Sequence, residues 1–569
     1  RFVRNEGLSY CINLVAKGAV RFGTAFAPRE NAKNLYVVEV NDSIFVLDAG
    51  LKYPENEQLG VDEVIPNLDY LIENKKRVQG IFLTHGHADA IGALPYILSE
   101  FKAPVFGSPL TIELAKLFVK KNNNVKKFNN FHVIDAETEI EFADATISFF
   151  KTTHSVPESL GIVVGTDEGN IVYTGDFKFD QAARKYYRTD LGRLTEIGRE
   201  GVLALLSDSA NATSHVMTAS EAEVAAEMDS AIADAEGRVI IAAVASNLVR
   251  IQQVFDSAAE YGRRVVLTGF DAENIVRTAI RMKRLRLVDE KLIIKPKDMH
   301  KYEDHELIIL EAGRMGEPIN GLHKMALGRH RYVQIKDGDL VYIVTTPSLS
   351  KEAAVARVEN LIYKAGGTVN LITKTLNVSG HANGRDLQLM LNLLQPKYLF
   401  PVQGEYRNLA AHAELAQEVG MYPENIYIVK RGDVMVLGKN GFNHEGSVPA
   451  GDVMIDGNAI GDVGNIVLRD RKVLSEDGIF IVALTVNKRE KKIVSKAKIH
   501  TRGFVYVKKS RDILRESAEL VNQTVENYLE QDSFDWGELK GAVRDEVAKF
   551  LFDQTKRRPA ILPVVMEVR

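Results

Sequence analysis

The chain has 569 residues, 45% of them hydrophobic, and a formal net charge of -4 at pH 7. This length and apolar content predict several globular domains and exclude a largely disordered chain. The near-neutral charge excludes an overall basic surface, so any nucleic-acid site must be a local patch.

The single cysteine, Cys11, excludes a disulfide framework and a thiolate metal site, and it fits the reducing cytoplasm. No apolar run reaches the roughly 18 residues that span a bilayer. We therefore expect a cytoplasmic protein without membrane contact.

Two strands are predicted first, over residues 35–40 and 44–47, joined by a short polar turn. The second ends at Asp48, a carboxylate at a strand end, which is also a common turn residue. A third strand is predicted over residues 81–83, and an apolar run predicts a helix over 93–98.

A dense group of metal-ligand side chains, His85-Gly86-His87-Ala88-Asp89, lies between that strand and that helix. Two imidazoles and a carboxylate so close together suit a borderline divalent ion such as zinc or manganese. The glycine lets the backbone bend so that both rings can face one point. We expect the ligands to lie on the turn, although a polar surface turn would have the same composition.

Strand and helix signals then alternate, with a polar residue just past each strand end. His154 follows the predicted strand 147–150, and Asp176 follows the predicted strand 171–174. Such alternation is typical of an α/β fold whose site lies along one edge of a sheet.

The domain organisation follows from the same signals. Repeated strand–helix units over residues 208–372 predict an α/β domain inserted between residues 1–207 and 373–438 of a first domain. Glycines and a proline make residues 439–452 a predicted linker. Residues 453–569 combine strands with two amphipathic helices, which predicts a third, compact α+β domain.

The motifs that carry a family resemblance are Asp48, His85, His87, Asp89, His154, Asp176, the run Ser207 to Ala212, Ala245-Ser246-Asn247 and Ser379-Gly380-His381. Together they resemble the metallo-β-lactamase-fold nucleases of the β-CASP group, and specifically the ribonuclease J family. The resemblance implies a metallo-β-lactamase αββα sandwich with an inserted β-CASP α/β domain and a small C-terminal α+β domain. It also implies a hydrolase of RNA in rRNA processing and mRNA decay, a 5'-3' exonuclease or an endonuclease.

The resemblance implies two metal ions, zinc or manganese, that clamp a water and a phosphodiester. The first ion would lie among three histidines, matched here by His85, His87 and His154. The second would be held by an aspartate and two histidines, whose positions here are Asp89, Ala90 and Gln403. The carboxylate that bridges the ions is matched by Asp176.

Both histidines of the second ion are thus absent, while the first ion's ligands are complete. A site that no longer holds that ion explains this better than two unrelated substitutions. We expect one ion at the three-histidine site and a second that is weak or absent. Removing one ion from a two-metal site costs about 3–6 kcal/mol of transition-state stabilisation, a factor of roughly 10² to 10⁴. The catalytic residues implied are Asp176, Asp89 and His381.

The resemblance also implies a pocket for the phosphate of a 5'-monophosphorylated RNA, formed by Ser246, Asn247, Asn377, Val378, Ser379, Gly380 and His381. Hydroxyls, an imidazole and the amides of a Ser-Gly turn suit a phosphate. Ser246-Asn247 could equally cap the helix after it, and His381 could be an ordinary core histidine. The lysines of residues 488–498 could contact phosphates or cover a solvated strand face, and those of residues 120–127 indicate an exposed loop.

Two functions from different classes remain open. One is a ribonuclease of low intrinsic activity. The other is an RNA-binding structural subunit that stabilises and tunes an active paralogue, because the degenerate site resembles the second paralogue of many Gram-positive bacteria. Assembly, as a homodimer or hetero-oligomer, would use the C-terminal domain. A small-molecule hydrolase fits less well because of the inserted domain and phosphate motifs.

Two departures from the family are the run Gly313 to Glu317 and the absence of a Leu-Gly-Gly segment before Glu30.

Overall fold

The computed structural model describes residues 20–23, 32–54, 58–269, 271–314, 317–345, 352–457, 459–460, 464–505, 510–531 and 533–568. Contacts divide the chain into two units, one of Arg1–Tyr53 with Ile65–Asp452 and one of Pro54–Val64 with Val453–Arg569. The predicted departures before Glu30 and at Met315-Gly316 lie outside the described residues. None of the helices in the described parts combines the length and apolarity needed to cross a bilayer.

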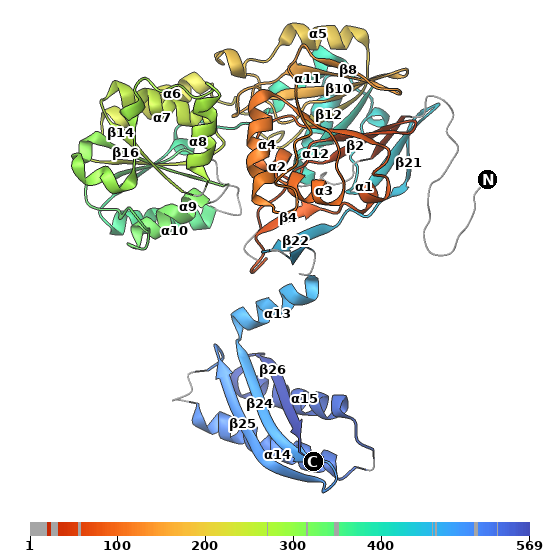
Figure 1. The fold of residues 1–569 in the computed structure, drawn as a ribbon, viewed down its shortest axis with the longest axis vertical. Coiled ribbons are helices and arrows are strands. Elements are labelled where there is room, and N and C mark those ends of the chain that lie inside the picture. Colours follow the sequence, from red (N-terminus) through yellow and green to blue (C-terminus); the bar gives the residue numbers. More distant parts are fainter. Residues whose placement is uncertain are drawn as a thin grey trace. The chain divides into compact units, whose positions relative to one another are not determined.

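Two sheets form the centre of the first unit (Figure 1). Among the described residues one has eight strands in the order β21-β20-β1-β2-β3-β5-β6-β7, and the other has six in the order β19-β12-β11-β10-β9-β8. The strands of the first are β1 Val20–Gly23, β2 Tyr36–Val40, β3 Ser43–Leu47, β5 Val78–Phe82, β6 Val105–Gly107, β7 Phe131–Val133, β20 Asp433–Gly438 and β21 Gly441–Ser447. Those of the second are β8 Glu139–Glu141, β9 Thr146–Lys151, β10 Leu160–Thr166, β11 Gly169–Tyr173, β12 Val202–Asp208 and β19 Tyr398–Val402.

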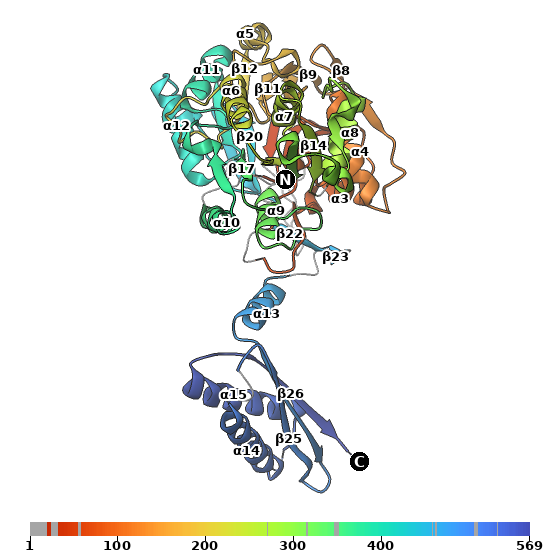
Figure 2. The ribbon, with the colours of Figure 1, turned by 90° about the vertical axis from the view of Figure 1, so that its left-hand side faces the viewer.

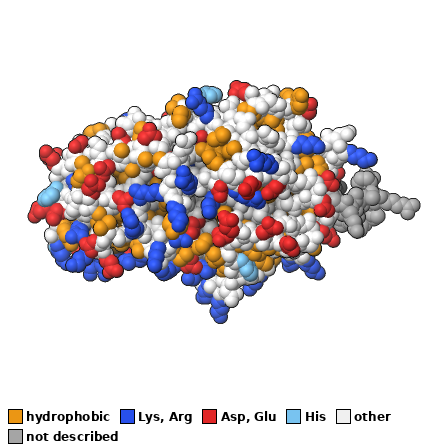
Figure 3. Space-filling view, turned by 90° about the horizontal axis from the view of Figure 1, so that it is seen from above, with side chains coloured by type: hydrophobic (Ala, Val, Ile, Leu, Met, Phe, Trp, Pro, Cys, Tyr) orange, Lys and Arg blue, Asp and Glu red, His pale blue; other side chains and the backbone are white. Residues whose placement is uncertain are grey.

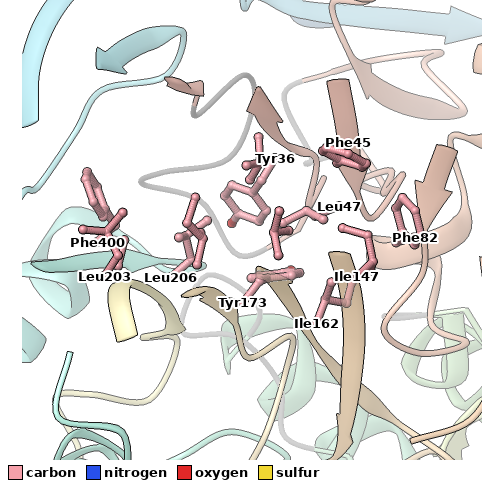
Figure 4. Packing of buried hydrophobic residues seen from close by; sticks show 14 of the residues in the cluster. Tyr36, Phe45, Leu47, Phe82, Ile147, Ile162, Tyr173, Leu203, Leu206 and Phe400 are labelled. Atoms are coloured by element: carbon pink, nitrogen blue, oxygen red, sulfur yellow. The ribbon is translucent and has the colours of Figure 1, made fainter. Parts of the chain in front are cut away.

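The main core lies between these two sheets (Figure 4). Alternate side chains of each strand point into it, because successive residues of a strand face opposite sides of the sheet. Tyr36 and Phe45 from one sheet meet Tyr173 and Leu206 from the other, all fully buried. Burial of each such side chain stabilises the fold by roughly 1.5–3 kcal/mol relative to leaving it exposed.

Helices cover the outer faces of the sandwich. They are α1 Asp69–Glu73, α2 Ala88–Ile91, α3 Leu94–Glu100 and α4 Pro109–Lys121 near the first sheet, and α5 Leu191–Glu200, α11 Gly384–Leu394 and α12 Tyr406–Glu418 on the second. Leu194, Leu387 and Leu415 of the last three pack in one core with residues of the six-stranded sheet. The αββα sandwich predicted from the sequence is confirmed.

A parallel sheet in the order β15-β14-β16-β13-β17-β18 forms the inserted domain (Figures 1 and 2). Its strands are β13 Val239–Val244, β14 Arg264–Thr268, β15 Ile293–Ile294, β16 Leu307–Gly313, β17 Leu340–Ile343 and β18 Thr368–Leu371. The helices are α6 Glu221–Ala233, α7 Leu248–Glu260, α8 Ala272–Arg281, α9 Glu317–Ala326 and α10 Glu352–Lys364. Helices on both faces explain why these strands are almost continuously apolar in sequence. The predicted inserted α/β domain is confirmed.

Short 3-10 helices lie in several connections, at η1 Lys185–Tyr187, η2 Glu290–Leu292, η3 Pro296–Lys301, η4 Asp304–Glu306, η6 Ile372–Lys374 and η7 Pro423–Asn425.

On the face of the molecule in Figure 3, basic and acidic side chains are interspersed, which agrees with the near-neutral net charge.

The second unit is an α+β domain, as predicted. A sheet in the order β25-β24-β26 is formed by β24 Ile479–Asn487, β25 Lys492–Arg502 and β26 Ala560–Glu567, with helices α13 Asn465–Glu476, α14 Arg511–Leu529 and α15 Trp536–Thr555. Every second residue of β24 is buried, and Phe480 and Val482 share a core with Val521 of α14 and Val543 of α15. The other strands β4 Glu63–Pro66, β22 Asp452–Asp456 and β23 Ala459–Ile460 form a small sheet in the order β23-β22-β4.

One predicted element is different in the structure. The segment 439–452 was expected to be a linker, but Gly441–Ser447 forms β21, which pairs with β20. This strand lies at the edge of its sheet, and only Gly441 and Phe442 are buried. A polar, glycine-rich edge strand has the same composition as a linker, so the pattern was misleading.

Candidate metal centre

The metal-ligand group of the sequence lies where β5 runs into α2. His85 and His87 are in the loop after the strand, whereas Asp89 is in the first turn of α2 and therefore not on the predicted turn. His85 is completely buried. Leu114 of α4 packs against the loop so closely that a side chain at Gly86 would overlap the Leu114 side chain. The loop is thus held rigidly between two elements of the first unit.

Ligand-type side chains from distant parts of the chain meet beside this loop. His154 follows β9 and Asp176 follows β11, and both strands end at the same edge of the six-stranded sheet, on either side of the antiparallel β10. The ligand atoms of His85, His87 and His154 all lie within 4.8 Å of one another. The same holds for the group His85, Asp89 and Asp176, and for the group Asp176, Asp208 and His381.

Hydrogen bonds fix the orientation of the His85 ring. Its Nδ1 lies 2.9 Å from the hydroxyl of Thr84, and that hydroxyl also lies 2.9 Å from a carboxylate oxygen of Asp48. Asp48 in turn accepts hydrogen bonds from the Thr84 backbone amide and, at 2.8 Å, from the Tyr173 hydroxyl. Burial raises the pKa of Asp48 to about 6, with His85, Thr84 and Tyr173 opposing that rise. Asp48 therefore supports a ligand and is more than a turn residue.

The Nε2 atoms of two histidines face a single carboxylate. His154 is oriented by its Nδ1, which lies 2.9 Å from the carbonyl oxygen of Gly380. The Nε2 atoms of His85 and His154 then lie 3.6 and 3.9 Å from Oδ2 of Asp176. Engaging the outer ring nitrogen is how proteins orient histidines that bind metals through the inner one.

The residues at this point fit one divalent ion. The Nε2 atoms of His85 and His154 and Oδ1 of Asp176 are buried polar atoms without a hydrogen-bond partner. Such atoms are rare in proteins, and here three from separate elements lie together. Burial and the Asp89 and Asp208 carboxylates raise the pKa of Asp176 well above its ordinary range, which a nearby cation would reverse.

His87 has a different environment from the other two histidines. Its Nδ1 lies 2.5 Å from the hydroxyl of Ser246, and its Nε2 lies 2.6 Å from that of Ser155. Burial and the neighbouring His85 lower the pKa of His87 to about 3, so its ring is neutral. A neutral ring is the form that binds metals, but one serine hydroxyl must give way before His87 can do so.

The position of the second ion does not fit a borderline divalent ion. Ala90 is fully buried and offers no ligand atom. Gln403 directs its amide nitrogen to Oδ2 of Asp89 at 3.4 Å, and the amide nitrogen of Asn34 lies at the same distance from that oxygen. The Asp89 carboxylate thus receives N–H groups where the family has an ion. Among the described residues, the amide oxygen of Gln403 is a buried polar atom without a hydrogen-bond partner, and an amide oxygen is a poorer ligand for such an ion than an imidazole.

The predicted phosphate pocket faces this centre from the inserted domain and from the segment before α11. Asn247 is the N-cap of α7 and accepts a hydrogen bond from the Arg250 amide, so the capping prediction is also correct. Ser246 beside it contacts His87. The side-chain amide nitrogen of Asn377 instead donates to the backbone carbonyl oxygen of Val216 at 3.0 Å, and Val378 next to it in the chain is buried.

His381 is paired with a carboxylate that the sequence reasoning had not placed in the site. Its Nδ1 lies 2.7 Å from Oδ2 of Asp208, and its backbone amide donates to the Ser379 hydroxyl. Burial lowers the pKa of His381, but the Asp208 carboxylate more than compensates, so the pKa lies above its ordinary value. The available signal was the position of Asp208 at the end of β12, which parallels Asp176 after β11.

Comparisons with known families cover most of the chain. The family profiles that match are "Metallo-beta-lactamase superfamily" over residues 28–214, "Ribonuclease J, beta-CASP domain" over 236–362, "Zn-dependent metallo-hydrolase RNA specificity domain" over 367–429 and "Ribonuclease J C-terminal domain" over 466–568. A protein named "Ribonuclease J 2" from Streptococcus pyogenes serotype M3 is 77% identical over 558 residues, which cover 98% of this chain and 100% of the relative. The chain belongs to the ribonuclease J family.

Other ribonuclease J proteins are more distant but match over nearly their whole length. "Ribonuclease J2" from Bacillus subtilis is 43% identical over 539 residues, covering 95% of this chain and 97% of the relative. "Ribonuclease J 2" from Staphylococcus epidermidis is 43% identical over 540 residues, covering 95% and 96%. A crystal structure of a protein of unknown function from Enterococcus faecalis V583 has a TM-score of 0.52 at 14% identity, covering 74% of this chain and 100% of that chain, and it shows the fold alone.

Membership of the ribonuclease J family confirms the resemblance seen in the sequence. It implies a metal cofactor, since the family carries the metallo-β-lactamase domain and the His and Asp groups described above, and it implies RNA as a partner. All these relatives carry the name of the second ribonuclease J.

Proposed function

We propose that this ribonuclease J binds 5'-monophosphorylated RNA in the cytoplasm and hydrolyses it slowly, with one zinc or manganese ion in place of two. RNA processing and decay is the function of the family to which the chain belongs. The observation that carries the proposal is that Ala90 and Gln403 leave the second ion without its histidines, while the Asp89 carboxylate takes amide hydrogen bonds.

The chain's own residues would bind the phosphate and move a proton. Ser246 and the Ser379-Gly380 turn would hold the phosphate near His85 and His154, which with Asp176 would hold the ion. A bound divalent ion acts as a Lewis acid on a phosphodiester and its attacking water. His381 donates its Nδ1 proton toward Asp208, so a proton on Nε2 is free to move to the leaving oxygen.

Slow hydrolysis follows from how charge develops during the reaction. Two ions stabilise both the attacking and the leaving oxygen of an in-line displacement, whereas one ion leaves half of that charge to hydrogen bonds. The deficit is about 3–6 kcal/mol, which corresponds to roughly 10² to 10⁴ in rate. RNA binding does not share this loss, because its contacts lie on the inserted domain and the Ser379-Gly380 turn.

Metal analysis tests the proposal directly. We expect purified protein, without a metal-binding tag, to contain about one zinc or manganese ion per chain, and His154→Ala to lose nearly all of it, because a catalytic site needs roughly three protein ligands. The control His381→Asn removes a partly exposed imidazole that is paired with Asp208, and this variant is expected to keep the ion. The same preparations are assayed for hydrolysis of 5'-monophosphorylated RNA with manganese.

Two results would contradict the proposal. One is wild-type protein that carries two ions per chain and cuts RNA as fast as other metal-dependent nucleases. The other is His154→Ala protein that keeps its ion, since this would place the metal elsewhere.

A second function, that of a structural subunit, is favoured by the open face of the C-terminal sheet. Helices α14 and α15 cover one face of this sheet. Ile481 of β24 and Leu562 of β26, which lie opposite each other in the strand pairing, point to the other face. Leu562 and Met566 of β26 are 50% and 51% exposed. Exposed apolar rows of this kind are typical of protein interfaces. We propose that this face joins the chain to a second copy or to an active ribonuclease J paralogue.

Assembly is tested by placing charges on that face. Leu562→Asp with Met566→Asp is expected to weaken association by roughly a hundredfold or more, because each apolar side chain contributes about 1.5–3 kcal/mol when buried. Light scattering measures the mass of the protein alone and mixed with an active paralogue. The control pair Val288→Asp and Tyr422→Asp adds the same charge at exposed sites of the first unit. If the two double variants give complexes of equal mass, this face is not the interface.

A further inference from the structure

A small basic pocket lies on the outer face of α4, away from the metal centre. It has a volume of about 170 Å³, well above the roughly 10–15 Å³ that one water molecule needs. The side chains that define it are Lys116, Lys120, Lys126, Phe128 and Phe131. The lysine-rich stretch that looked like an ordinary exposed loop in the sequence therefore forms, with α4 and β7, a concave surface.

The positive charge of this pocket is only partly neutralised. Lys116 forms an ion pair with Glu113 at 2.7 Å. Lys126 donates to the side-chain oxygen of Asn123, which carries no charge. Within the described residues neither Lys120 nor Lys126 forms an ion pair, and both are exposed. Two ammonium groups are thus available to an anion at the rim.

The floor of the pocket is aromatic. The rings of Phe128 and Phe131 meet edge to face with their centroids 5.0 Å apart, and both are half-buried. The Lys116 ammonium lies 5.6 Å from the centre of the Phe131 ring. Partly exposed phenylalanine rings beside lysines are the combination that proteins use to stack bases while holding the phosphates between them.

The location of the pocket links it to the site already described. Leu114 on the inner face of α4 contacts the ligand loop at Gly86, while Lys116 and Lys120 lie on the outer face. Lys120 comes six residues after Leu114 on α4 Pro109–Lys121, a rise of about 9 Å along the helix axis, so the pocket lies within a few nucleotides of the ligand loop. Helix α4 lies beside α8 of the inserted domain (Figures 1 and 2), and the ion pairs Glu113–Arg281 and Lys121–Asp271 join them.

We propose that this pocket is an accessory site for single-stranded RNA, which takes one base on the phenylalanines and flanking phosphates on Lys120 and Lys126. The inference rests on the proposed function, because it assumes that the same RNA is held at the metal centre. An acidic peptide would use the lysines but would leave the aromatic floor without a planar partner. The aromatic floor therefore favours a base.

The experiment uses the full chain and two 5'-monophosphorylated oligoadenylates, a short one that only fills the metal centre and a longer one that also reaches α4. Binding is measured by fluorescence anisotropy, with chelator present to prevent cleavage, at several salt concentrations. We expect Lys120→Gln with Lys126→Gln to weaken binding of the long RNA alone. Its slope of log affinity against log salt should fall by about 1.4, since each phosphate contact on a single strand contributes roughly 0.7.

The aromatic floor is tested separately. Phe128→Leu is expected to weaken binding of the long RNA by roughly five- to a hundredfold, which is the usual range for one base stacked on an aromatic side chain. An oligonucleotide without bases over that segment should bind the wild type and Phe128→Leu equally. Lys75→Gln with Lys76→Gln, which removes the same charge from an exposed turn of the same domain, is the matched control.

Several outcomes would overturn the accessory site. One is that the Lys120→Gln, Lys126→Gln variant binds the long RNA as tightly as the Lys75→Gln, Lys76→Gln control does. If the short RNA is still bound, this outcome leaves the metal-centre proposal intact. Another is Phe128→Leu binding the long RNA as the wild type does. A third is labelled polyglutamate binding as tightly as RNA and being lost in the lysine variant, since the pocket would then be a peptide site. Wild-type protein that binds neither RNA would overturn both proposals.

Discussion

Restoring the two missing imidazoles, with Ala90→His and Gln403→His together, is expected to speed hydrolysis of 5'-monophosphorylated RNA by roughly 10² to 10⁴. The double variant would place two neutral nitrogen ligands beside Asp89, so that the three could hold a second ion, in place of a methyl group and an amide. The backbone at Gln403 is left-handed, with a φ of 53°, which histidine tolerates better than most residues. The rate is measured with manganese, together with the metal content, which should rise toward two ions per chain.

Each single variant is the natural control, because one added histidine still leaves the second ion short of a ligand. Asp176→Asn in the restored protein should abolish the gain if the gain depends on the bridging carboxylate. Ala90 is fully buried, so its replacement could disturb packing, and the thermal unfolding of each variant is compared with the wild type. A wild type that is already as fast as the double variant would show that the missing ion does not limit the rate.

The positions of the site residues were predictable wherever a residue follows a strand of the sheet. His85, His154 and Asp176 each come just after a strand, so the α/β pattern placed each of them at a strand end. The pattern did not show that His85 belongs to one sheet and the other two residues to the sheet packed against it. The boundaries of most strands and helices were also readable, since their apolar periodicity is strong. The edge strand β21 was not, because its polar and glycine-rich sequence has no such periodicity.

What the sequence could not show was the set of partners that each site residue uses. The pairs Asp208–His381, Ser246–His87 and Asn34–Asp89 each join residues far apart in the chain. A local pattern carries no signal for such pairs, because either residue alone is compatible with a cap, a turn or a core position. These partners nevertheless decide which ring nitrogens remain for a metal, so the chemistry of the site became clear only from the structure.

The amide contacts to Asp89 explain how the site remains stable without a second ion. Even a partly buried carboxylate that has no cation beside it is costly unless hydrogen-bond donors take the cation's place. Gln403 and Asn34 both direct N–H groups to that carboxylate. The glutamine at this position therefore does more than omit a ligand, because it supplies a neutral N–H donor to Asp89. Burial raises the pKa of Asp89, but the neighbouring histidines, above all His85, hold it below its ordinary range.

A buried group of charges joins the first domain to the inserted one. Glu221, at the start of α6, accepts a hydrogen bond from Lys178 at 2.8 Å and lies 3.4 Å from the Arg250 guanidinium of α7. Both cations are almost fully buried. Burial opposes ionisation of Glu221, but Arg250 and Lys178 hold its pKa below the ordinary range. Arg250 is one turn from Ser246, so this group also sets the position of the phosphate pocket over His87.

Glu221→Gln is expected to lower the free energy of unfolding by about 3–5 kcal/mol, because it leaves two buried cations without their shared anion. Urea unfolding followed by circular dichroism measures this loss, and RNA affinity should fall with it as α7 shifts. Glu196→Gln, which breaks an exposed pair with Arg193, should cost less than about 1 kcal/mol. Adding Lys178→Met to Glu221→Gln should recover part of the stability, because it removes a buried cation whose remaining anion, Asp180, lies as far as 4.0 Å from it. If Glu221→Gln behaves like Glu196→Gln, the ion group does not hold the two domains together, and the position of Ser246 over the metal centre must be set by other contacts.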